Sequence, residues 1–359
     1  MDAAPEGTVA SEEITPEELR LATRNHGLPL EALREPITPA GLHYLLIHYD
    51  IPVVDPAGYR LEIGGEVVRP LTLSLDDLRA RRRVRLPVTF ECAGNGRALL
   101  APRPLSQPWL TEAVGTAEWA GVPLGDLLEE AGVRAGSVEA LFTGLDRGVE
   151  GGVSQAYERS LPLAETERAL LAYEMNGAPL PPQHGFPLRL VVPGWYGMTN
   201  VKWLARVTLL AEPFGGYQNA VAYRFYGADG EPGEPVTRML PRSLMAPPGV
   251  PDFASRERLL EPGPVELRGR AWSGWGAIER VEVSVDGGRS FADAELEPPL
   301  SEAAWCGWTF AWDAPAGRHE LCSRATDAAG NCQPLEPAWN LKGYANNAVE
   351  RIAVTVAPT

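Results

Sequence analysis

The stretch VTFECAGNGR, residues 88–97, places one cysteine between a β-forming run and a series of small residues. The run before Cys92 favours a buried strand, and residues 93–96 after it are typical of a sharp turn. A thiol at the end of a strand projects into the space that such a turn leaves open. Because a thiolate is a soft ligand that suits transition metals, Cys92 is a candidate metal ligand, with an ordinary buried cysteine as the alternative.

Arg97 lies five positions after Cys92 and favours the metal interpretation. A guanidinium near a thiol stabilises the charged thiolate and therefore lowers the pKa of the thiol. The same group could hold an anionic substrate close to the sulfur.

A second stretch, QHGFPLRLVVPGWYGMTNVKWL at residues 183–204, gathers three cationic side chains around a glycine-rich, aromatic turn. His184, Arg189 and Lys202 together predict a pocket for phosphate or another multivalent anion. Taken singly, each has an ordinary explanation: a turn cap, a partner for a carboxylate and a solvated lysine.

Other polar and aromatic residues carry weaker signals. In YQNAVAYRFY, residues 217–226, Tyr223 or Tyr226 could donate a hydrogen bond to an oxyanion, although simple packing explains tyrosines equally well. Trp109 is typical of a packed aromatic residue, Asp146 of a turn and Lys342 of a surface. The nucleophile, zinc-protease and nucleotide-binding motifs GxSxG, HExxH, GxxxxGK[ST] and GxGxxG do not occur.

Composition excludes several classes of function. The formal charge is −15, which argues against nucleic acid as a ligand, because a phosphate backbone requires a basic surface. No uninterrupted apolar run is long enough to span a membrane. The acidic, polar N-terminus shows no secretory signal, so the sequence predicts a cytoplasmic protein, or a periplasmic one if an export signal has been removed. The cysteines Cys92, Cys306, Cys322 and Cys332 match no zinc or covalent-haem spacing. Free thiols are expected, with a bridge between Cys322 and Cys332 as the alternative.

The order of elements predicts an α+β protein with two domains. Residues 1–40 are expected to form an arm with a short helix in TPEELRLATRN, followed by a mixed α/β domain over residues 41–245. A proline-rich segment, 241–253, is interpreted as a linker or a crossover segment. Short alternating runs in residues 246–359 predict an all-β, immunoglobulin-like sandwich with a tight turn at residues 286–288.

Three blocks of sequence resemble the sulfite oxidase family of molybdenum enzymes: FECAGNGR (90–97), LLAYEMNGAPLPPQHGFPLRLVVPGWYGMTNVKWL (170–204) and RGRAWSGWGAIERVEVSVDGGRSF (268–291). They occur in the order that the family has. The resemblance implies a domain that binds molybdenum through one pterin dithiolene, followed by an immunoglobulin-like domain that forms a homodimer. The chain is similar to the bacterial single-chain type without a haem domain.

The resemblance also implies roles for individual residues. Cys92 is the protein thiolate on molybdenum. The residues that match cofactor-holding positions are Tyr44, His48, Asp146, His184, Arg189, Lys202 and the backbone at Asn200 and Val201. The residues that match the substrate pocket are Arg97, Trp109, Tyr223, His48 and Lys342, the last replacing an arginine of the relatives. The implied reaction is oxidation of sulfite to sulfate by oxo transfer, with electrons passing to a separate acceptor such as a cytochrome.

One position departs from the family pattern. Relatives carry an Arg-Asn-His triplet in which the arginine contacts substrate, whereas this chain has Leu46, Ile47 and His48 there. Loss of that guanidinium removes a charge-assisted contact of about 1.5–3 kcal/mol. An earlier RNHG, starting at Arg24, could replace it if the arm folds back. Two alternatives remain: a reductase of an oxyanion such as nitrate, and a binding protein without a cofactor.

Overall fold

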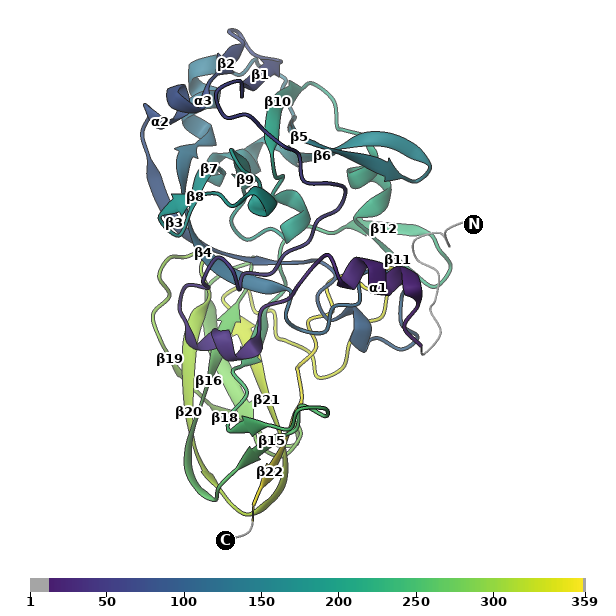
Figure 1. Ribbon diagram of the computed structural model, residues 1–359, viewed down its shortest axis with the longest axis vertical. Coiled ribbons are helices and arrows are strands. Elements are labelled where there is room, and N and C mark those ends of the chain that lie inside the picture. The colour runs from purple at the N-terminus through teal and green to yellow at the C-terminus, as the bar shows by residue number, and fades with distance from the viewer. Residues whose placement is uncertain (1–12, 358–359) are drawn as a thin grey trace.

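The structure is a computed structural model that describes residues 13–357 (Figure 1). Two β-sheets form the upper domain of Figure 1, and the predicted α+β class is confirmed. The first sheet has the strand order β2-β1-β10-β5-β6 (Leu71–Leu73, Leu61–Gly65, Leu204–Leu210, Glu139–Glu150 and Val153–Pro162). The second has the order β3-β4-β7-β8, with β9 also paired to β7 (Val84–Glu91, Val114–Pro123, Leu170–Met175, Ala178–Pro179 and Arg189–Val191).

Short helices with clear start signals border these sheets. The predicted helix of the arm is α1, Pro16–Ala22, which begins with a capping box between Thr15 and Glu18. Ser74 and Asp77 form a second capping box at α2, Leu75–Arg79. Helix α3, Leu124–Ala131, ends at Gly132, as the sequence predicts. Single turns complete the set: η1 Leu30–Arg34, η2 Arg97–Leu99, η3 Leu163–Arg168, η4 Pro182–His184, η5 Gly197–Thr199 and the π-turn η6 Gln218–Ala222.

The lower domain is the predicted β-sandwich (Figure 1). One sheet has the order β13-β16-β20-β19 (Arg242–Met245, Gly263–Trp272, Cys306–Ala314 and Glu295–Leu296). The other has the order β14-β15-β22-β21-β17-β18 (Val250–Pro251, Arg258–Leu260, Ile352–Val356, Gly317–Asp327, Ile278–Ser284 and Ala292–Asp293). A turn at residues 286–288 joins β17 to β18, as expected. A two-stranded ribbon, β11 and β12 (Arg224–Tyr226 and Pro232–Pro235), lies outside both domains' sheets.

The interpretation of residues 241–253 as a linker is wrong. Arg242–Met245 forms β13, which pairs with β16 over four residues and is buried. One proline of this segment precedes β13 and the other three follow it, and the four residues of β13 are too few to be recognised as a strand. The domain boundary at residue 245 stays a prediction. Because β13 pairs with β16 of the sandwich, we propose that the second domain starts before Arg242.

The N-terminal segment lies across both domains. In Figure 1 it passes from α1 over the top of the sandwich and then along the upper domain to β1. Arg270 of the sandwich donates through Nε to the carbonyl of Leu33 (2.9 Å). Asn25 donates to Gln107 (2.9 Å) and accepts from the backbone of Ile47 (2.8 Å). These contacts hold the arm beside the loops that follow β3.

All four cysteines have free thiols, so Cys322 and Cys332 are not bridged. Cys332 is exposed and the other three are buried. Within residues 13–357, no helix is long and apolar enough to cross a membrane.

Close contact between β4 and β7 depends on Gly121. A Cβ atom at this position would overlap the carbonyl oxygen of Leu171 on the paired strand. We therefore expect Gly121→Ala to lower the free energy of unfolding by about 1–3 kcal/mol. Gly64→Ala on β1 is the matched control, because no heavy atom lies within 4 Å of its Cβ position. Urea denaturation measures both variants, and equal losses would contradict the prediction.

Candidate active site

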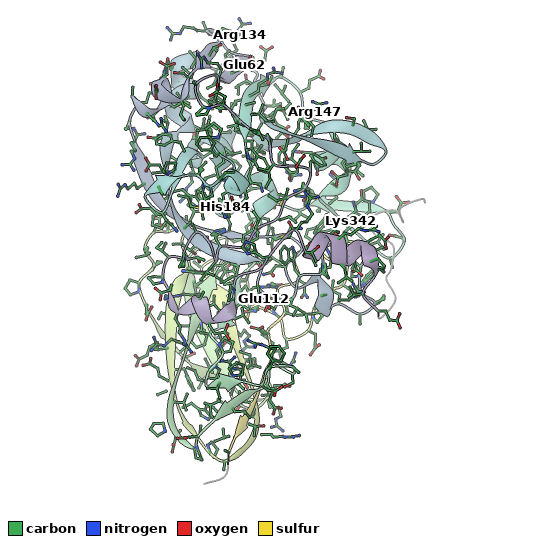
Figure 2. All side chains as sticks on the ribbon, in the orientation of Figure 1. Glu62, Glu112, Arg134, Arg147, His184 and Lys342 are labelled. Atoms are coloured by element: carbon green, nitrogen blue, oxygen red, sulfur yellow. The ribbon has the colours of Figure 1, made fainter. Side chains whose placement is uncertain are left out.

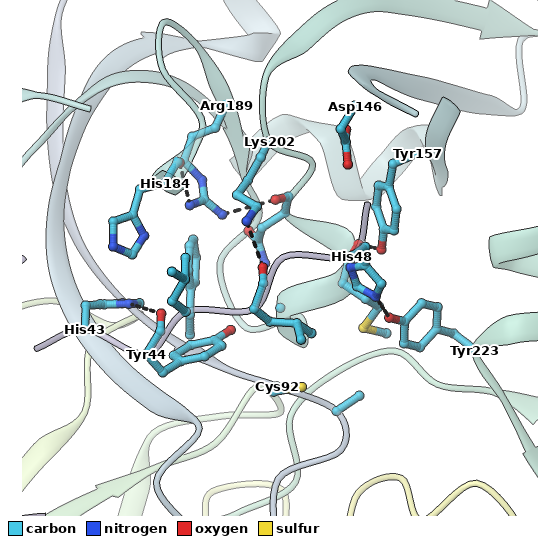
Figure 3. Close-up of a pocket in the computed structure, with 17 residues that line it drawn as sticks. His43, Tyr44, His48, Cys92, Asp146, Tyr157, His184, Arg189, Lys202 and Tyr223 are labelled. Carbon is cyan, nitrogen blue, oxygen red and sulfur yellow. Dashed lines mark hydrogen bonds between the residues drawn. The ribbon is translucent and has the colours of Figure 1, made fainter. Parts of the chain in front are cut away.

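A cleft of about 670 Å³ opens in the upper domain at the end of β3 (Figure 3). Its walls come from residues 43–48, the ends of β3 and β9, the β5–β6 hairpin, η5 and the residue after η6. Nine of the predicted site residues line it: Tyr44, His48, Cys92, Asp146, His184, Arg189, Asn200, Lys202 and Tyr223. Residues from distant parts of the sequence therefore meet in this cleft.

Cys92 lies on the floor of this cleft, directly after β3. Its backbone N–H donates to the carbonyl of Ala113 (2.9 Å), and its own carbonyl accepts from Asn95 N–H (2.9 Å), which closes the turn. Gly96 completes the turn with φ 86°, a value that residues with a Cβ rarely adopt. Burial raises the pKa of the Cys92 thiol, and the Arg97 guanidinium reduces this effect without reversing it. The expected lowering of that pKa is thus not observed in the metal-free chain, because desolvation is the larger influence.

Arg189 and Lys202 form a cationic wall without a carboxylate partner. Arg189 donates to the carbonyl oxygens of His184 (3.0 Å) and Asn200 (3.1 Å). The Lys202 ammonium donates to the carbonyls of Leu46 (2.8 Å) and Gln183 (3.2 Å). Burial lowers the pKa of Arg189 to about 10, and burial together with the Arg189 charge lowers the pKa of Lys202 to about 7. Within residues 13–357, neither cation has an ion-pair partner within 4 Å. Both charges therefore favour the binding of an anion.

Two histidines stand beside this wall and are neutral at pH 7. Burial and the neighbouring cations lower the pKa of His184 to about 2. Burial lowers the pKa of His43 to about 4, and its ring lies 5.5 Å from that of His184. The sequence does not single out His43, since one histidine next to Tyr44 carries no motif. His43 lines the cleft because residues 43–48 pack against β3 and η4.

Asp146 is a buried carboxyl with an unpartnered oxygen. Its Oδ1 has no hydrogen-bond partner among residues 13–357, and burial raises its pKa to about 6 despite the opposing charge of Lys202. Asp146 comes from β5, where the register with β6 shifts between Thr143 and Arg147. This irregularity directs the carboxyl towards the cleft, where a bound group with N–H donors could satisfy it.

The wall opposite the cations is aromatic (Figure 3). The Nε2 atom of His48 lies 2.6 Å from the Tyr223 hydroxyl, and the His48 ring packs 4.9 Å from the ring of Tyr157. Burial lowers the pKa of His48 to about 3 and raises the pKa of Tyr223 well above its usual range. Both side chains are therefore neutral. Depending on the tautomer of His48, either the Tyr223 O–H donates to Nε2 or Nε2–H donates to the Tyr223 oxygen. Tyr157, on β6, is a lining residue that sequence reasoning missed, and no local pattern indicates it.

Four predicted site residues do not line the cleft. Val201 packs in the core, and its backbone N–H and carbonyl are already paired with Thr199 and Leu190. Trp109 packs in the same apolar cluster as Cys92, and its side chain opposes the rise in the pKa of the Cys92 thiol that burial causes.

Arg97 and Lys342 lie together below the Tyr223 side of the cleft. Arg97 donates through Nε to the carbonyl of Lys342 (2.8 Å), and its guanidinium lies 5.2 Å from the centre of the Tyr344 ring. The Lys342 ammonium, labelled in Figure 2, donates to the carbonyls of Val221 and Ala222 in η6. Lys342 therefore supports the turn that precedes Tyr223, and Arg97 holds the backbone of Lys342.

The arm does not supply a substitute for the missing arginine. Leu46 lines the cleft at the aligned position. Arg24 is exposed, lies outside the lining and donates to the carbonyl of Tyr49 (2.7 Å). Although the arm does fold back on residues 45–47, its guanidinium is directed away from the cleft.

The chain matches two protein-family models. The oxidoreductase molybdopterin binding domain matches residues 48–218, and the Mo-co oxidoreductase dimerisation domain matches residues 251–357. Mitochondrial sulfite oxidase of Mus musculus is 38% identical over 92% of this chain and 64% of that protein. Sulfite oxidase of Gallus gallus is 36% identical over 90% of this chain and 74% of that protein.

The chain belongs to the sulfite oxidase family. It spans 64% of the length of the mouse relative. Among solved structures, the sulfane dehydrogenase SoxCD of Paracoccus pantotrophus superimposes with a TM-score of 0.81 at 27% identity, over 97% of this chain and 89% of that chain.

The residues of the cleft fit the molybdenum cofactor of this family. The unpaired charges of Arg189 and Lys202 suit its phosphate, and the unpartnered Asp146 Oδ1 suits an N–H of a pterin. Cys92 offers one soft ligand. Residues 13–357 contain no group of three or more His, Cys, Asp or Glu side chains that could hold a metal alone. A metal at Cys92 would therefore take its other ligands from the pterin and from solvent.

The charge on Lys202 destabilises the cofactor-free fold, and Lys202→Met tests this. At pH 6 the lysine is charged in both folded and unfolded chains, so the folded state bears the full cost of burying it. We expect the variant to be more stable there by about 1 kcal/mol or more. The advantage should shrink between pH 7 and about 10, because the folded-state pKa of about 7 lies below the unfolded value of about 10.4. Urea denaturation at pH 6, 8 and 10 measures it, and a pH-independent difference would contradict the assignment.

Proposed function

We propose that this chain oxidises sulfite to sulfate at a molybdenum ion bound by Cys92 and one pterin dithiolene. The observation that carries the proposal is the placement of the Cys92 thiol on the floor of a cleft whose wall bears two buried cations without carboxylate partners. Family membership supports the same chemistry. When bound, the cofactor supplies two-electron oxo transfer.

The cationic wall is proposed to hold the cofactor's phosphate. Arg189 and Lys202 would exchange part of their carbonyl contacts for the phosphate oxygens, while neutral His184 adds a hydrogen bond. Asp146 would accept an N–H of the pterin, and Tyr44 and Asn200 would enclose it. Val201 would contribute only by packing, because both of its backbone groups are occupied.

The aromatic wall is proposed to receive the substrate anion. With its proton on Nε2, His48 donates to the Tyr223 oxygen and leaves the phenol O–H available for a sulfite oxygen. The raised pKa of Tyr223 keeps that proton in place at neutral pH. Arg97 and Lys342 add positive charge on this side, and Trp109 excludes water beside Cys92. A local field of this kind can bind an anion although the chain as a whole is negative.

The partners follow from the same family. The second domain matches a dimerisation domain, so we propose a homodimer formed through the sandwich. The electrons would leave to a separate acceptor such as a cytochrome.

A second candidate substrate is a sulfane sulfur compound. The similar solved structure is named a sulfane dehydrogenase, and this chain has Leu46 where relatives carry an arginine. A cleft with one guanidinium fewer discriminates less strongly in favour of a compact dianion, so a larger sulfur substrate of lower charge density would compete better.

Replacing Cys92 tests the metal ligand. We expect Cys92→Ser to retain the pterin, because Arg189 and Lys202 are unchanged, and to lose at least about 100-fold in sulfite oxidation. Cys332→Ser is the control, since that thiol is exposed. Sulfite-dependent ferricyanide reduction and elemental analysis provide the measurements, and unchanged turnover in Cys92→Ser would refute the proposal. Nitrate with a reduced dye tests the reductase alternative, and wild-type protein without molybdenum would favour a binding protein.

Restoring the missing cation tests the substrate. We expect Leu46→Arg to lower the KM for sulfite about 10-fold, which corresponds to one charge-assisted contact, with little change in kcat. Leu46→Met is the neutral control of similar size. Steady-state kinetics with sulfite and with a sulfane compound compare the two candidates. If wild type prefers the sulfane compound and Leu46→Arg reverses that preference, the second candidate is the native substrate.

A further inference from the structure

The turn that carries Cys92 is fastened on both sides by residues of the second domain. The backbone N–H of Ala345 donates to the carbonyl of Ala93 (2.7 Å). The side-chain amide of Asn346 donates to the carbonyl of Gly96 (2.7 Å). A segment 250 residues away in sequence thus bonds to two carbonyls of the turn, and the Gly96 carbonyl also accepts from Leu99 N–H (3.1 Å).

Beneath the turn, the second domain also holds the side chain of Glu91. Glu91 is the last residue of β3 and is 2% exposed. Its Oε2 accepts from the indole N–H of Trp272 (2.9 Å), and its Oε1 accepts from Asn95 (3.0 Å) and lies 3.2 Å from the Arg242 NH1 atom. Two hydrogen-bond donors and one cation therefore hold one carboxylate, and the cation and the indole donor come from the sandwich.

Arg242 and Trp272 form one rigid unit. They lie directly opposite each other on the paired strands β13 and β16. Both side chains are at most 2% exposed, so their rotamers are restricted by packing. A displacement of this strand pair would move both side chains together, and with them their contacts with Glu91.

We propose that Arg242 and Trp272 are positioning residues, which set the place of the Cys92 sulfur in the cleft by holding the carboxylate of Glu91. The proposal rests on the function proposed above and deepens it, because it makes the sandwich part of the metal site. Consecutive Cα atoms are about 3.8 Å apart across a planar peptide, so a rotation of Glu91 carries Cys92 with it.

Charge supplies a second reason for this arrangement. An unpaired carboxylate at Glu91 would repel a thiolate on the adjacent residue in a poorly solvated site. Arg242 compensates that charge from the side away from the cleft. The Glu91–Arg242 pair therefore fixes the position of Cys92 and also prevents electrostatic repulsion between Glu91 and the Cys92 thiolate.

The simpler explanation is that these residues only stabilise the contact between the domains. Arg270 provides the comparison, because it lies on the same strand as Trp272, is 8% exposed and also bridges to another segment of the chain. Its partners are Leu33, Arg34 and Glu297, and none belongs to the Cys92 turn. If these residues only stabilise the contact between the domains, replacing Arg242 and replacing Arg270 should have similar effects.

The test uses the double variant Glu91→Gln with Arg242→Gln, which removes both charges of this ion pair together. Trp272→Phe removes only the indole donor and retains a buried ring, and Arg270→Gln is the control. In the cofactor-free chain, mass spectrometry after alkylation reports the reactivity of Cys92. In the loaded chain, the thiolate-to-molybdenum absorption band reports its geometry.

We expect alkylation of Cys92 to be at least about 5-fold faster in the double variant, and the absorption band to shift. The kcat for sulfite should fall about 10-fold or more with KM nearly unchanged, because sulfur placement affects turnover rather than anion binding. Trp272→Phe should show smaller changes of the same kind, and Arg270→Gln should change only the thermal unfolding temperature.

Unchanged alkylation and an unchanged band in both Glu91→Gln/Arg242→Gln and Trp272→Phe would overturn the proposal. Equal effects of Arg270→Gln would overturn it as well, in favour of domain stability alone. A wild-type protein that shows the band but does not oxidise sulfite would refute the proposed function, while the variants would still decide the positioning role.

Discussion

Two buried cations that lack a carboxylate partner set the character of the cleft. Arg189 and Lys202 are removed from water, and backbone carbonyls, neighbouring aromatic rings and, for Lys202, the charge of Asp146 compensate them in part. Such compensation is incomplete, and the lowered pKa values of both groups express the remaining cost. The neighbouring histidines respond to the same field and stay neutral. A multivalent anion at this wall would offset that cost, and so the folded chain is prepared for the phosphate of its family's cofactor.

The site also depends on where the two domains meet. Glu112, labelled in Figure 2, lies at this level of the molecule, and the carbonyl of the next residue, Ala113, accepts from Cys92 N–H. The turn after β3 receives hydrogen bonds from Ala345 and Asn346, and the arm contacts the loop before Trp109 through Gln107. None of these elements would hold the cysteine alone. The sandwich therefore has a local structural task in addition to the dimerisation for which its family model is named.

The charges of the chain are distributed unevenly, which reconciles its acidity with an anionic substrate. The net charge is −15, yet the side chains that face the cleft are mainly cationic, neutral histidine or aromatic. Asp146 is the exception, and its raised pKa of about 6 reduces its negative charge near neutral pH. Leu46 further lowers the positive field on the substrate side. The cationic wall favours the cofactor, whereas the aromatic wall is only weakly charged. The difference in charge between the two walls therefore bears on specificity.

The sequence by itself determined the local features. The stretch TPEELRLATRN indicated α1, alternation located the sandwich strands, and Cys92 with the cationic stretch 183–204 indicated a site. These signals depend on residues a few positions apart, so they survive without knowledge of the fold. Only the tertiary structure decided that β13 belongs to the sandwich, that His43 and Tyr157 line the cleft, and that Arg97 bonds to the backbone of Lys342. It also decided the thiol's pKa, because burial depends on all the segments packed around Cys92, most of them distant in sequence.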